Sequence, residues 1–431
     1  PTGMKGMKTK YEAAFVMNPE EEDTFGLHEN VAVFDFKSLY PSMMAARNIS
    51  WETKTNDDDG HNVHFSMPKN LVEWEGEKPS VSFCKDKIGI LPQAVLTLMK
   101  MRDEYKAKRK NASNDEEYRK WDSAQMATKR GVNALYGVLA KDGYGWGDMQ
   151  MAQAITASAR EAMRSVAFKA IDLGYEVIYG HTDSIFVKVG NVGEAVVLCS
   201  KLNEHIQNEV FNEHVVLEFE KYAKSFFLSK KKNRYCGYLS WKDGEFIDDE
   251  FFVMGFEMKK SNETKLAKEV QSQILKMVAS GKTETDVTKY AKAMYKIVKG
   301  GKYKPSSVIK QSRLRKSLDE YDSIAGGSAG VLFYNQEIGT IEVGDSYYFY
   351  NVDNKGIKDF PRQYEVKGRI RNVEYIAFKK LEEVIDNFPI NWVRLAESEI
   401  SKKVSLIYES LRWDLSAIAN DGRQTTLDSW W

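Results

Sequence analysis

Apolar and polar positions alternate in short runs over much of the first 245 residues, which is typical of a body built on β-strands. Residues 31–36 predict a buried strand, and residues 38–42 predict the turn that leaves it. Residues 176–189 contain two β-rich runs around a short polar centre, the pattern of a hairpin. Residues 215–227 again have the composition of a strand. These segments predict an antiparallel sheet.

Longer stretches between the strands have the spacing of amphipathic helices. Leu91 and Pro92 open a helix whose apolar positions give way to a basic face ending near Lys110, and residues 111–115 break it. A second helix is predicted over residues 116–139, so that two antiparallel helices project from the sheet. A third is predicted over residues 151–173, closed by Gly174.

Beyond about residue 245 the pattern predicts a mainly helical region. Its clearest helical segments are residues 261–279, 286–299 and 388–411, and residues 331–352 predict a β-rich interruption. Residues 420–431 have the composition of a flexible tail.

Composition narrows the class of protein. The chain has 431 residues, 42% of them hydrophobic and 29% charged, which predicts two or three domains of an ordinary globular protein. No apolar run is long enough for a membrane span, and the first thirty residues lack the pattern of a signal segment. The three cysteines lie far apart without a CxxC pair, which argues against a zinc or iron–sulfur site and indicates a reducing, cytoplasmic compartment.

The distribution of charge is more informative than its total. Lys plus Arg equals Asp plus Glu, 62 against 62, yet residues 289–316 contain ten basic residues and no acidic one. Residues 221–234 form a second basic stretch. Either stretch alone fits a solvated surface as well as a phosphate-binding track, but two in a neutral chain favour a polyanionic partner.

Two aspartates are candidates for metal chemistry. Asp35 ends an otherwise apolar strand, and Asp183 lies at the tip of the predicted hairpin. Each alone is usually a turn residue or a cap. If strand and hairpin are neighbours in one sheet, the two carboxylates repel each other and need cations. Oxygen ligands of this kind suit Mg²⁺.

Three short segments carry the most specific patterns of the chain: DFKSLYPS at Asp35–Ser42, KRGVNALYG at Lys129–Gly137 and YGHTDS at Tyr179–Ser184. In this order they resemble motif A (DxxSLYPS), motif B (KxxxNSxYG) and motif C (YxDTDS) of family B DNA polymerases. Residues 232–235 are similar to the family's KKRY segment, and residues 254–261 to the start of its thumb. The resemblance covers nearly the whole chain.

The resemblance implies the right-hand polymerase fold of the α+β class, with an antiparallel-sheet palm, helical fingers and a mostly helical thumb. The implied parts are the palm, residues 1–87 (with a linker remnant, 1–30) and 141–244; the fingers, 88–140; the thumb, 245–419; and a clamp-binding tail, 420–431.

It also implies DNA-directed DNA polymerase activity by two-metal nucleotidyl transfer, with primer–template DNA and deoxynucleoside triphosphates as substrates. Asp35 and Asp183 would bind two Mg²⁺ ions, for which Mn²⁺ can substitute, and the Phe36 carbonyl would be a further ligand. Lys129 would donate a proton to pyrophosphate, and Tyr40 would exclude a 2′-hydroxyl.

Further residues would bind the nucleotide and the duplex. The implied nucleotide-binding residues are Ser38, Leu39, Tyr40, Arg102, Lys106, Lys129, Asn133 and Tyr136. The implied DNA-binding residues are Gly137, Lys232, Arg234 and Tyr235. Without the family, the cations among them would be ordinary solvated side chains of exposed helices.

The chain departs from the family pattern at two positions. Motif B has Ala134 in place of Ser, a mild change. Motif C has His181 in place of its first Asp, which removes a negative charge and can shift metal affinity or preference. Glu220 matches a family acidic residue and is a candidate for a compensating carboxylate; a strand-edge glutamate that faces water is the alternative.

The last eight residues resemble a sliding-clamp-binding box. Gln424, Leu427, Trp430 and Trp431 have the spacing of its glutamine, aliphatic and aromatic positions. Two tryptophans in a polar terminus favour a partner groove, and a tail that folds back on its own domain is the alternative.

About thirty residues precede Asp35, without an exonuclease signature. We therefore expect a polymerase without its own proofreading exonuclease, either a fragment or one partnered by a separate exonuclease-bearing chain, in a prokaryotic or viral replication context. Two other classes remain open: a catalytically weakened homologue that holds DNA and clamp, and another nucleotidyltransferase such as a reverse transcriptase or primase-like enzyme.

Overall fold

The computed structural model describes residues 14–56, 60–64, 80–141, 143, 145–259 and 262–419. The chain divides into two compact units. Unit 1 consists of Pro1–Asn18, Glu29–Lys224 and Leu239–Asp248, and unit 2 of Pro19–His28, Ser225–Tyr238 and Asp249–Trp431. None of the helices in the described ranges is both long enough and apolar enough to cross a membrane.

A six-stranded sheet has the order β5-β6-β1-β7-β8-β9. Its strands are β1 (Gly26–Phe36), β5 (Glu176–His181), β6 (Ser184–Lys188), β7 (Leu217–Leu228), β8 (Tyr235–Lys242) and β9 (Glu245–Met254). The strands β5 and β6 and most of β1 belong to unit 1, whereas β7, β8 and β9 contain residues of both units. The middle of the sheet is a β1–β6 antiparallel pair that runs from Val31 opposite Lys188 to Asp35 opposite Ser184. The predicted strand, hairpin and strand of this region are confirmed.

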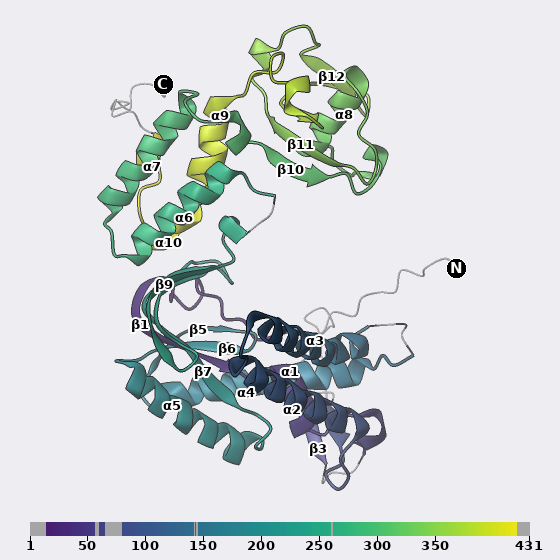
Figure 1. Cartoon of the computed structure of the whole chain (residues 1–431), viewed down its shortest axis with the longest axis vertical. Helices are drawn as coiled ribbons and strands as arrows, with labels where there is room; N and C mark the ends of the chain where they lie inside the picture. The colour runs from purple at the N-terminus through teal and green to yellow at the C-terminus, as the bar shows by residue number, and fades with distance from the viewer. Residues whose placement is uncertain are drawn as a thin grey trace, which may run out of the picture. The chain divides into compact units, whose positions relative to one another are not determined.

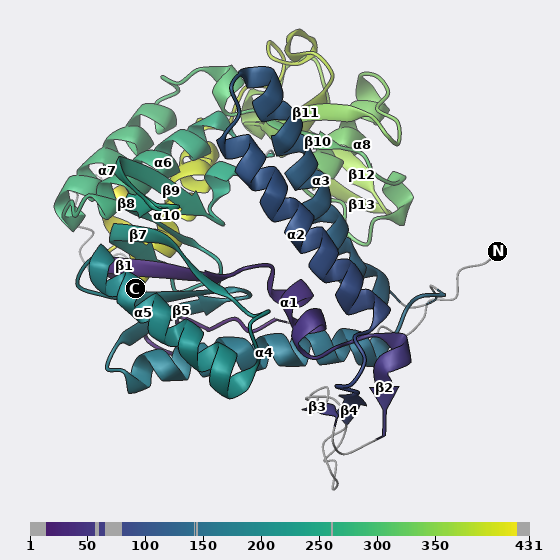
Figure 2. The ribbon, with the colours of Figure 1, turned by 60° about the horizontal axis from the view of Figure 1, so that its bottom comes forward.

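Two helices, α4 (Met149–Asp172) and α5 (Val192–His205), cover one face of this sheet in unit 1 (Figure 2). The core between them buries Phe34 of β1 with Met163 and Leu198 of the helices. The predicted helix over residues 151–173 is confirmed by α4, and Gly174 follows it with a φ of +88°.

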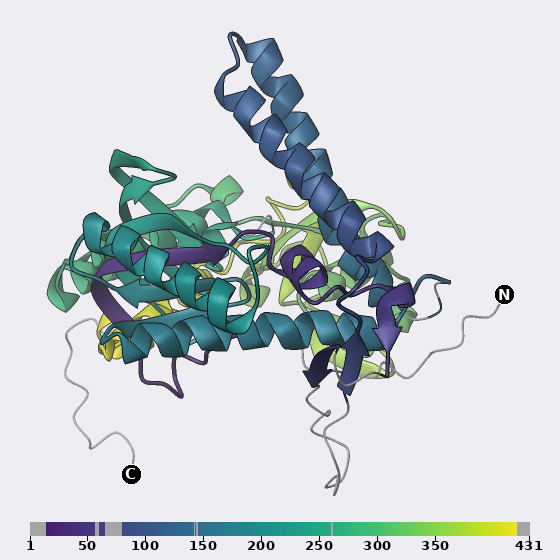
Figure 3. The same ribbon diagram turned by 90° about the horizontal axis from the view of Figure 1, so that it is seen from below.

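The helices α2 (Ile90–Lys110) and α3 (Asp115–Leu139) form an antiparallel pair that projects from the rest of unit 1 (Figure 3). Asn114 caps α3 by accepting a hydrogen bond from the amide of Glu117. Near the turn, Tyr105 stacks on Trp121 at 5.7 Å and Arg109 pairs with Asp122 at 2.7 Å. The prediction of two projecting helices is confirmed.

The predicted turn over residues 38–42 is wrong beyond its first residue. Ser38 has a φ of 54°, and the helix α1 (Leu39–Ala46) begins directly after it. Pro41 suggested a turn, but it lies in the first helical turn, where a missing N–H costs no hydrogen bond. A 3₁₀ turn (Trp51–Thr53) and a small sheet follow. The strands of that sheet are β2 (Lys54–Thr55), β3 (His61–His64) and β4 (Ser80–Phe83).

Unit 2 has one part built of packed helices (Figure 1). Its main helices are α6 (Lys265–Ala279), α7 (Glu284–Lys299), α9 (Trp392–Ala396) and α10 (Lys402–Leu411), with a π-helical turn at Glu397–Ser401 and the short α11 (Ser416–Ala419). Their shared core includes Ile274, Ala291 and Ile407. The three helical segments predicted after residue 245 are confirmed.

The rest of unit 2 has more strand than predicted. One helix, α8 (Gly327–Glu337), packs against a three-stranded sheet with the order β10-β11-β14. The strands are β10 (Lys310–Arg313), β11 (Ser346–Asn351) and β14 (Tyr375–Phe378), beside the hairpin of β12 (Gln363–Val366) and β13 (Arg369–Asn372).

The predicted β-rich segment 331–352 is therefore wrong for its first seven residues, which are helical. Val331, Phe333 and Tyr334 have high β-propensity, but all three are buried in the core of unit 2 from the helix. Burial in tertiary contacts outweighs the local preference here, because β-propensity mainly measures how a side chain packs.

Candidate active site

The hairpin turn between β5 and β6 lies against the end of β1. The amide of Phe36 donates a hydrogen bond to the carbonyl of Asp183 at 2.8 Å. Across the sheet, the hydroxyl of Ser184 donates to Oδ1 of Asp35 at 2.5 Å. The left-handed Thr182, with a φ of 54°, lets the chain reverse in two residues. The backbone thus brings the two aspartates, 148 positions apart in the sequence, to one place.

The surroundings of the two aspartates oppose their ionisation. Burial, together with the nearby Asp183 carboxylate, raises the pKa of Asp35 to about 7. Burial also raises the pKa of Asp183 above its ordinary value. The cations that act on them, Lys221 on Asp35 and Lys129 on Asp183, are too weak to reverse these shifts. The pair is therefore short of positive charge.

Both aspartates line a cavity of about 510 Å³ within unit 1. The predicted site residues on its wall are Asp35, Phe36, Ser38, Leu39, Tyr40, Arg102, Lys106, Lys129, Asn133, Tyr136, Asp183 and Glu220. They come from β1, α1, the two projecting helices, the hairpin turn and β7. Residues far apart in the sequence thus surround one space that is large enough for a nucleotide-sized ligand.

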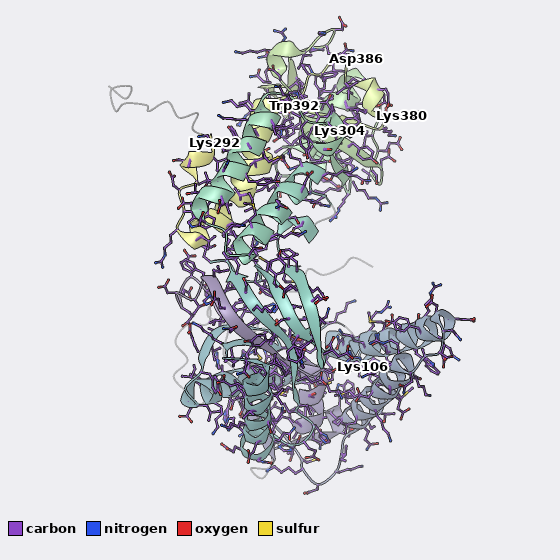
Figure 4. All side chains as sticks on the ribbon, turned by 60° about the vertical axis from the view of Figure 1, so that its left-hand side comes forward. Lys106, Lys292, Lys304, Lys380, Asp386 and Trp392 are labelled. Atoms are coloured by element: carbon purple, nitrogen blue, oxygen red, sulfur yellow. The ribbon has the colours of Figure 1, made fainter. Side chains whose placement is uncertain are left out.

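The projecting helices supply the positive wall of the cavity. Arg102 and Lys106 lie one helical turn apart on α2, and Lys129 lies on α3 (Figure 4 marks Lys106). Burial and the Arg102 guanidinium lower the pKa of Lys106. Arg102 also donates to the hydroxyl of Ser38 at 3.2 Å. An anion in the cavity would relieve the mutual repulsion of these cations.

The start of α1 forms the floor between the acidic and basic walls. The first intrahelical bond runs from the amide of Ser42 to the carbonyl of Ser38, so the amides of Ser38 and Leu39 precede the helical ladder. Amides in this position favour phosphate groups. The rings of Tyr40 and Tyr136 meet beside them at 4.6 Å between centroids.

His181 does not line the cavity. It is the last residue of β5, and its ring lies parallel to that of Tyr179 at 6.3 Å between centroids. Burial lowers the pKa of His181, although Asp183 opposes that effect, so the imidazole is neutral at pH 7. The neighbouring strand bridge to Val16 fixes its backbone. The histidine is thus beside the acidic pair without adding charge to it.

Glu220 lies on the cavity wall, where a compensating carboxylate would have to be, and not on a strand edge that faces only water. Its carboxylate pairs with Lys221 at 2.8 Å, and it raises the pKa of both Asp35 and Asp183. Its charge is therefore felt at the acidic pair.

The sequence analysis missed five residues of the cavity wall: Lys37, Pro41, Thr182, Glu218 and Asp243. Glu218 had a signal, because residues two apart in a strand share a face and Glu220 had been identified. Lys37 lies inside motif A and pairs with Asp103 of α2 at 2.7 Å. Asp243, in a turn after β8, had no signal in the sequence.

The predicted DNA-binding residues lie outside this cavity. Gly137 is on α3, and a Cβ built there would meet nothing within 4 Å. In unit 2, Lys232 is exposed, and Arg234 lines a second cavity of about 370 Å³ together with Lys231 and Lys402. Tyr235 is buried against Phe226, which leaves little of its ring for DNA. The tail residues Gln424, Leu427, Trp430 and Trp431 lie outside the described residues.

The acidic pair suits Mg²⁺ better than a metal ion that takes all of its ligands from the protein. Within the described ranges, no three His, Cys, Asp or Glu side chains gather closely enough to form a complete metal cage. Mg²⁺ needs only one or two carboxylates, because it keeps waters and accepts substrate phosphates. The raised pKa of Asp35 is expected for a carboxylate whose ionised form lacks a nearby cation to stabilise it.

Comparison with known proteins identifies a family to which this chain is similar. The sequence profile of DNA polymerase family B matches residues 2–388. A DNA polymerase of Archaeoglobus fulgidus is 32% identical over 317 residues, which are 73% of this chain and 36% of that protein. DNA polymerase 1 of Aeropyrum pernix is 26% identical over 414 residues, 93% of this chain and 40% of that protein.

A solved structure is also similar. The family B DNA polymerase of Pyrobaculum calidifontis has a TM-score of 0.60 and 25% identity, over 94% of this chain and 48% of that one. The predicted fold class, α+β with antiparallel sheets, is confirmed. The chain spans about two fifths of the length of the curated relatives it matches.

Proposed function

Because this chain belongs to DNA polymerase family B, we propose that it is a DNA-directed DNA polymerase that adds deoxynucleoside triphosphates to a primer 3′-hydroxyl on a DNA template. One observation carries the proposal: a single cavity has an acidic pair, Asp35 and Asp183, on one wall and the cations Arg102, Lys106 and Lys129 on another. Nucleotidyl transfer needs both, since metal-bound hydroxyl and triphosphate must be held together.

The acidic wall would hold two Mg²⁺ ions. Asp35 and Asp183 would be shared ligands, and the Phe36 carbonyl a further one. When bound, the ions would lower the pKa of the attacking hydroxyl and neutralise the leaving pyrophosphate. Ser184 contributes by fixing the Asp35 carboxyl through its hydroxyl.

The basic wall and the floor would bind the triphosphate. Arg102 offers a planar guanidinium for two phosphate oxygens, and the Ser38 and Leu39 amides offer backbone donors. Lys129 Nζ would give a proton to the departing pyrophosphate, while Asn133 on the same helix face would position the phosphates.

Tyr40 and Tyr136 would flank the sugar and the nascent base pair. Their rings are in contact at 4.6 Å, so a bulky 2′-substituent beside Tyr40 would meet a fixed aromatic wall. This proposal predicts discrimination against ribonucleotides. In this scheme, α2 and α3 are the fingers, the strands β1 and β5 to β8 form the sheet of the palm, and the chain from about residue 245 is the thumb.

A primer-extension assay with Mg²⁺ tests the proposal. The wild type is expected to extend a primer on a DNA template, and Asp35→Ala and Asp183→Ala are expected to abolish extension while they still bind the duplex. If the wild type is folded but does not extend the primer, the alternative of a DNA- and clamp-binding homologue is favoured. The neutral His181 is the observation that supports this alternative.

Two further predictions concern partners. One involves the C-terminal tail, which lies outside the described residues, and the other involves a second polypeptide. Clamp binding by residues 424–431 remains a prediction, which calorimetric titration of a sliding clamp against full-length protein and a 424–431 deletion can test. A separate exonuclease-bearing chain remains a prediction as well.

A further inference from the structure

Trp146 is an exposed tryptophan held in a defined position. Its side chain belongs to the loop between α3 and α4, and it is 66% exposed. Its ring meets that of the half-buried Trp51 edge-on, with 5.6 Å between centroids. A tryptophan that is both exposed and held in place by a second ring offers a flat apolar surface on which another planar group can stack.

Polar contacts hold together the two segments that carry the tryptophan pair, Trp51 and Trp146. Lys54, three residues after Trp51, binds Asp148 at 2.5 Å and Gln150 at 3.1 Å. The amide of Asp148 also donates to the carbonyl of Leu139 at 3.0 Å, which closes the loop at the end of α3. The pair is therefore preorganised, so a ligand would lose little free energy in ordering it.

The same two segments of chain carry a second aromatic pair. Tyr40 is the second residue of α1 and lines the cavity, and the chain reaches Trp51 five residues after that helix ends. Tyr136, in contact with Tyr40, lies near the end of α3, which leads into the loop of Trp146. The eight residues of α1 extend about 12 Å, a length covered by three to four stacked nucleotides.

We propose that the tryptophan pair is a stacking platform for the unpaired template strand just beyond the nucleotide cavity. The inference rests on the proposed polymerase function, since only a primer–template places a single strand there. Aromatic platforms bind any base through its π-face, as a template-reading enzyme requires. The two aromatic pairs lie on the same two segments of chain, one of them in the nucleotide cavity, which favours single-stranded DNA over a protein partner.

A binding experiment with three labelled DNA ligands tests the platform. All ligands have the same duplex, one blunt, one with a six-nucleotide 5′ template overhang, and one with the same overhang on the primer 3′ end. Trp146→Ala is expected to weaken binding of the 5′-overhang ligand about fivefold or more. It is expected to leave the blunt and 3′-overhang ligands unchanged, and Trp146→Phe is expected to restore most of the loss.

Phe168→Ala is the matched control, because Phe168 of α4 is 67% exposed, nearly the same as Trp146. It should change none of the three affinities. Equal losses on all ligands, or no loss on the 5′-overhang ligand, would overturn the platform. Failure of the wild type to extend a primer would instead reject the underlying polymerase function, so the two failures are distinguishable.

Discussion

Asp35 is a half-buried carboxyl group whose ionised form is destabilised in the folded protein until a cation binds. Its pKa of about 7 lies well above the ordinary 3.8, so the folded protein keeps a proton that the unfolded chain releases between about pH 4 and pH 7. Without bound cation, stability therefore falls as pH rises through that window. The shift corresponds to about 4 kcal/mol at most.

We predict that Asp35→Asn raises the melting temperature at pH 8 more than at pH 5, because the neutral amide removes this penalty. Mg²⁺ is expected to stabilise the wild type at pH 8 and to leave the variant unchanged. Differential scanning fluorimetry at both pH values measures this. Asp286→Asn is the control: hydrogen bonds from Thr283 lower the pKa of Asp286, so its effect should not vary between pH 5 and 8. Equal shifts for Asp35→Asn at both pH values would contradict the prediction.

His181 occupies the position where the family motif has an aspartate. Since burial keeps its imidazole neutral, it adds no attraction for Mg²⁺. We predict that His181→Asp keeps or raises Mg²⁺-dependent primer extension and lowers the Mg²⁺ concentration of half-maximal activity. His181→Asn, which is neutral and of similar size, should behave like the wild type. If the aspartate variant folds but no longer extends primers, the histidine has a positive role in the site.

The sequence predicted most of the cavity because its residues lie in three short motifs, each local in the chain. Glu218 was missed although its two-residue spacing from Glu220 in β7 was a signal. Asp243 was missed because it reaches the cavity from a turn after β8, which no local pattern encodes. The contact of Lys37 with Asp103 is likewise a tertiary feature.

At the scale of elements, the predictions succeed where the apolar pattern favours one kind of element and fail where the same side chains suit two. Residues 31–36 of β1 form a short continuous apolar run, and α4 is a long segment rich in helix-forming residues; both were predicted. The helix α8 was predicted as strand, because Val331, Phe333 and Tyr334 suit either structure. Tertiary packing decides that this segment is a helix, because α8 packs on β14, a strand that is distant in sequence.

Gly330 makes this packing possible. A Cβ added at Gly330 would lie 2.8 Å from the amide nitrogen of Ala377 and 3.0 Å from the carbonyl carbon of Ile376, both backbone atoms of β14. We predict that Gly330→Ala destabilises the protein by about 1–3 kcal/mol, since helix and strand must separate. Thermal or urea unfolding measures the change.

Gly131 provides the matched control for that substitution. It also lies within a helix, α3, but a Cβ there would meet nothing within 4 Å. Gly131→Ala should therefore stabilise the protein by about 0.5–1 kcal/mol, because alanine loses less backbone entropy than glycine in a helix. Destabilisation by both substitutions would show that α8 packing is not what makes Gly330 sensitive.

At the scale of the whole molecule, positive and negative charges are equal in number but unevenly distributed. The formal net charge is +0, yet the exposed side of α7 carries Lys289, Lys292, Lys296 and Lys299, spaced three and four residues apart (Figure 4 marks Lys292). The opposite side is the buried face of Val287, Ala291, Tyr295 and Val298. Like charges at this spacing destabilise a helix slightly, so the arrangement favours a polyanionic partner.

The number of phosphates that this stripe neutralises can be counted from salt dependence. Each phosphate neutralised on duplex DNA contributes about 0.9 to the slope of log affinity against log salt concentration. We predict that replacing Lys289, Lys292 and Lys296 with glutamine lowers the magnitude of that slope by about one to three. Replacing Lys108, Lys110 and Lys120 at the tip of α2 and α3 removes the same charge and should change the slope less. If both triple variants lower the slope equally, the effect comes from net charge, and α7 is not a preferred DNA-binding surface. If only the α7 variant lowers the slope, the basic stretch predicted from the sequence binds DNA through the lysines of α7.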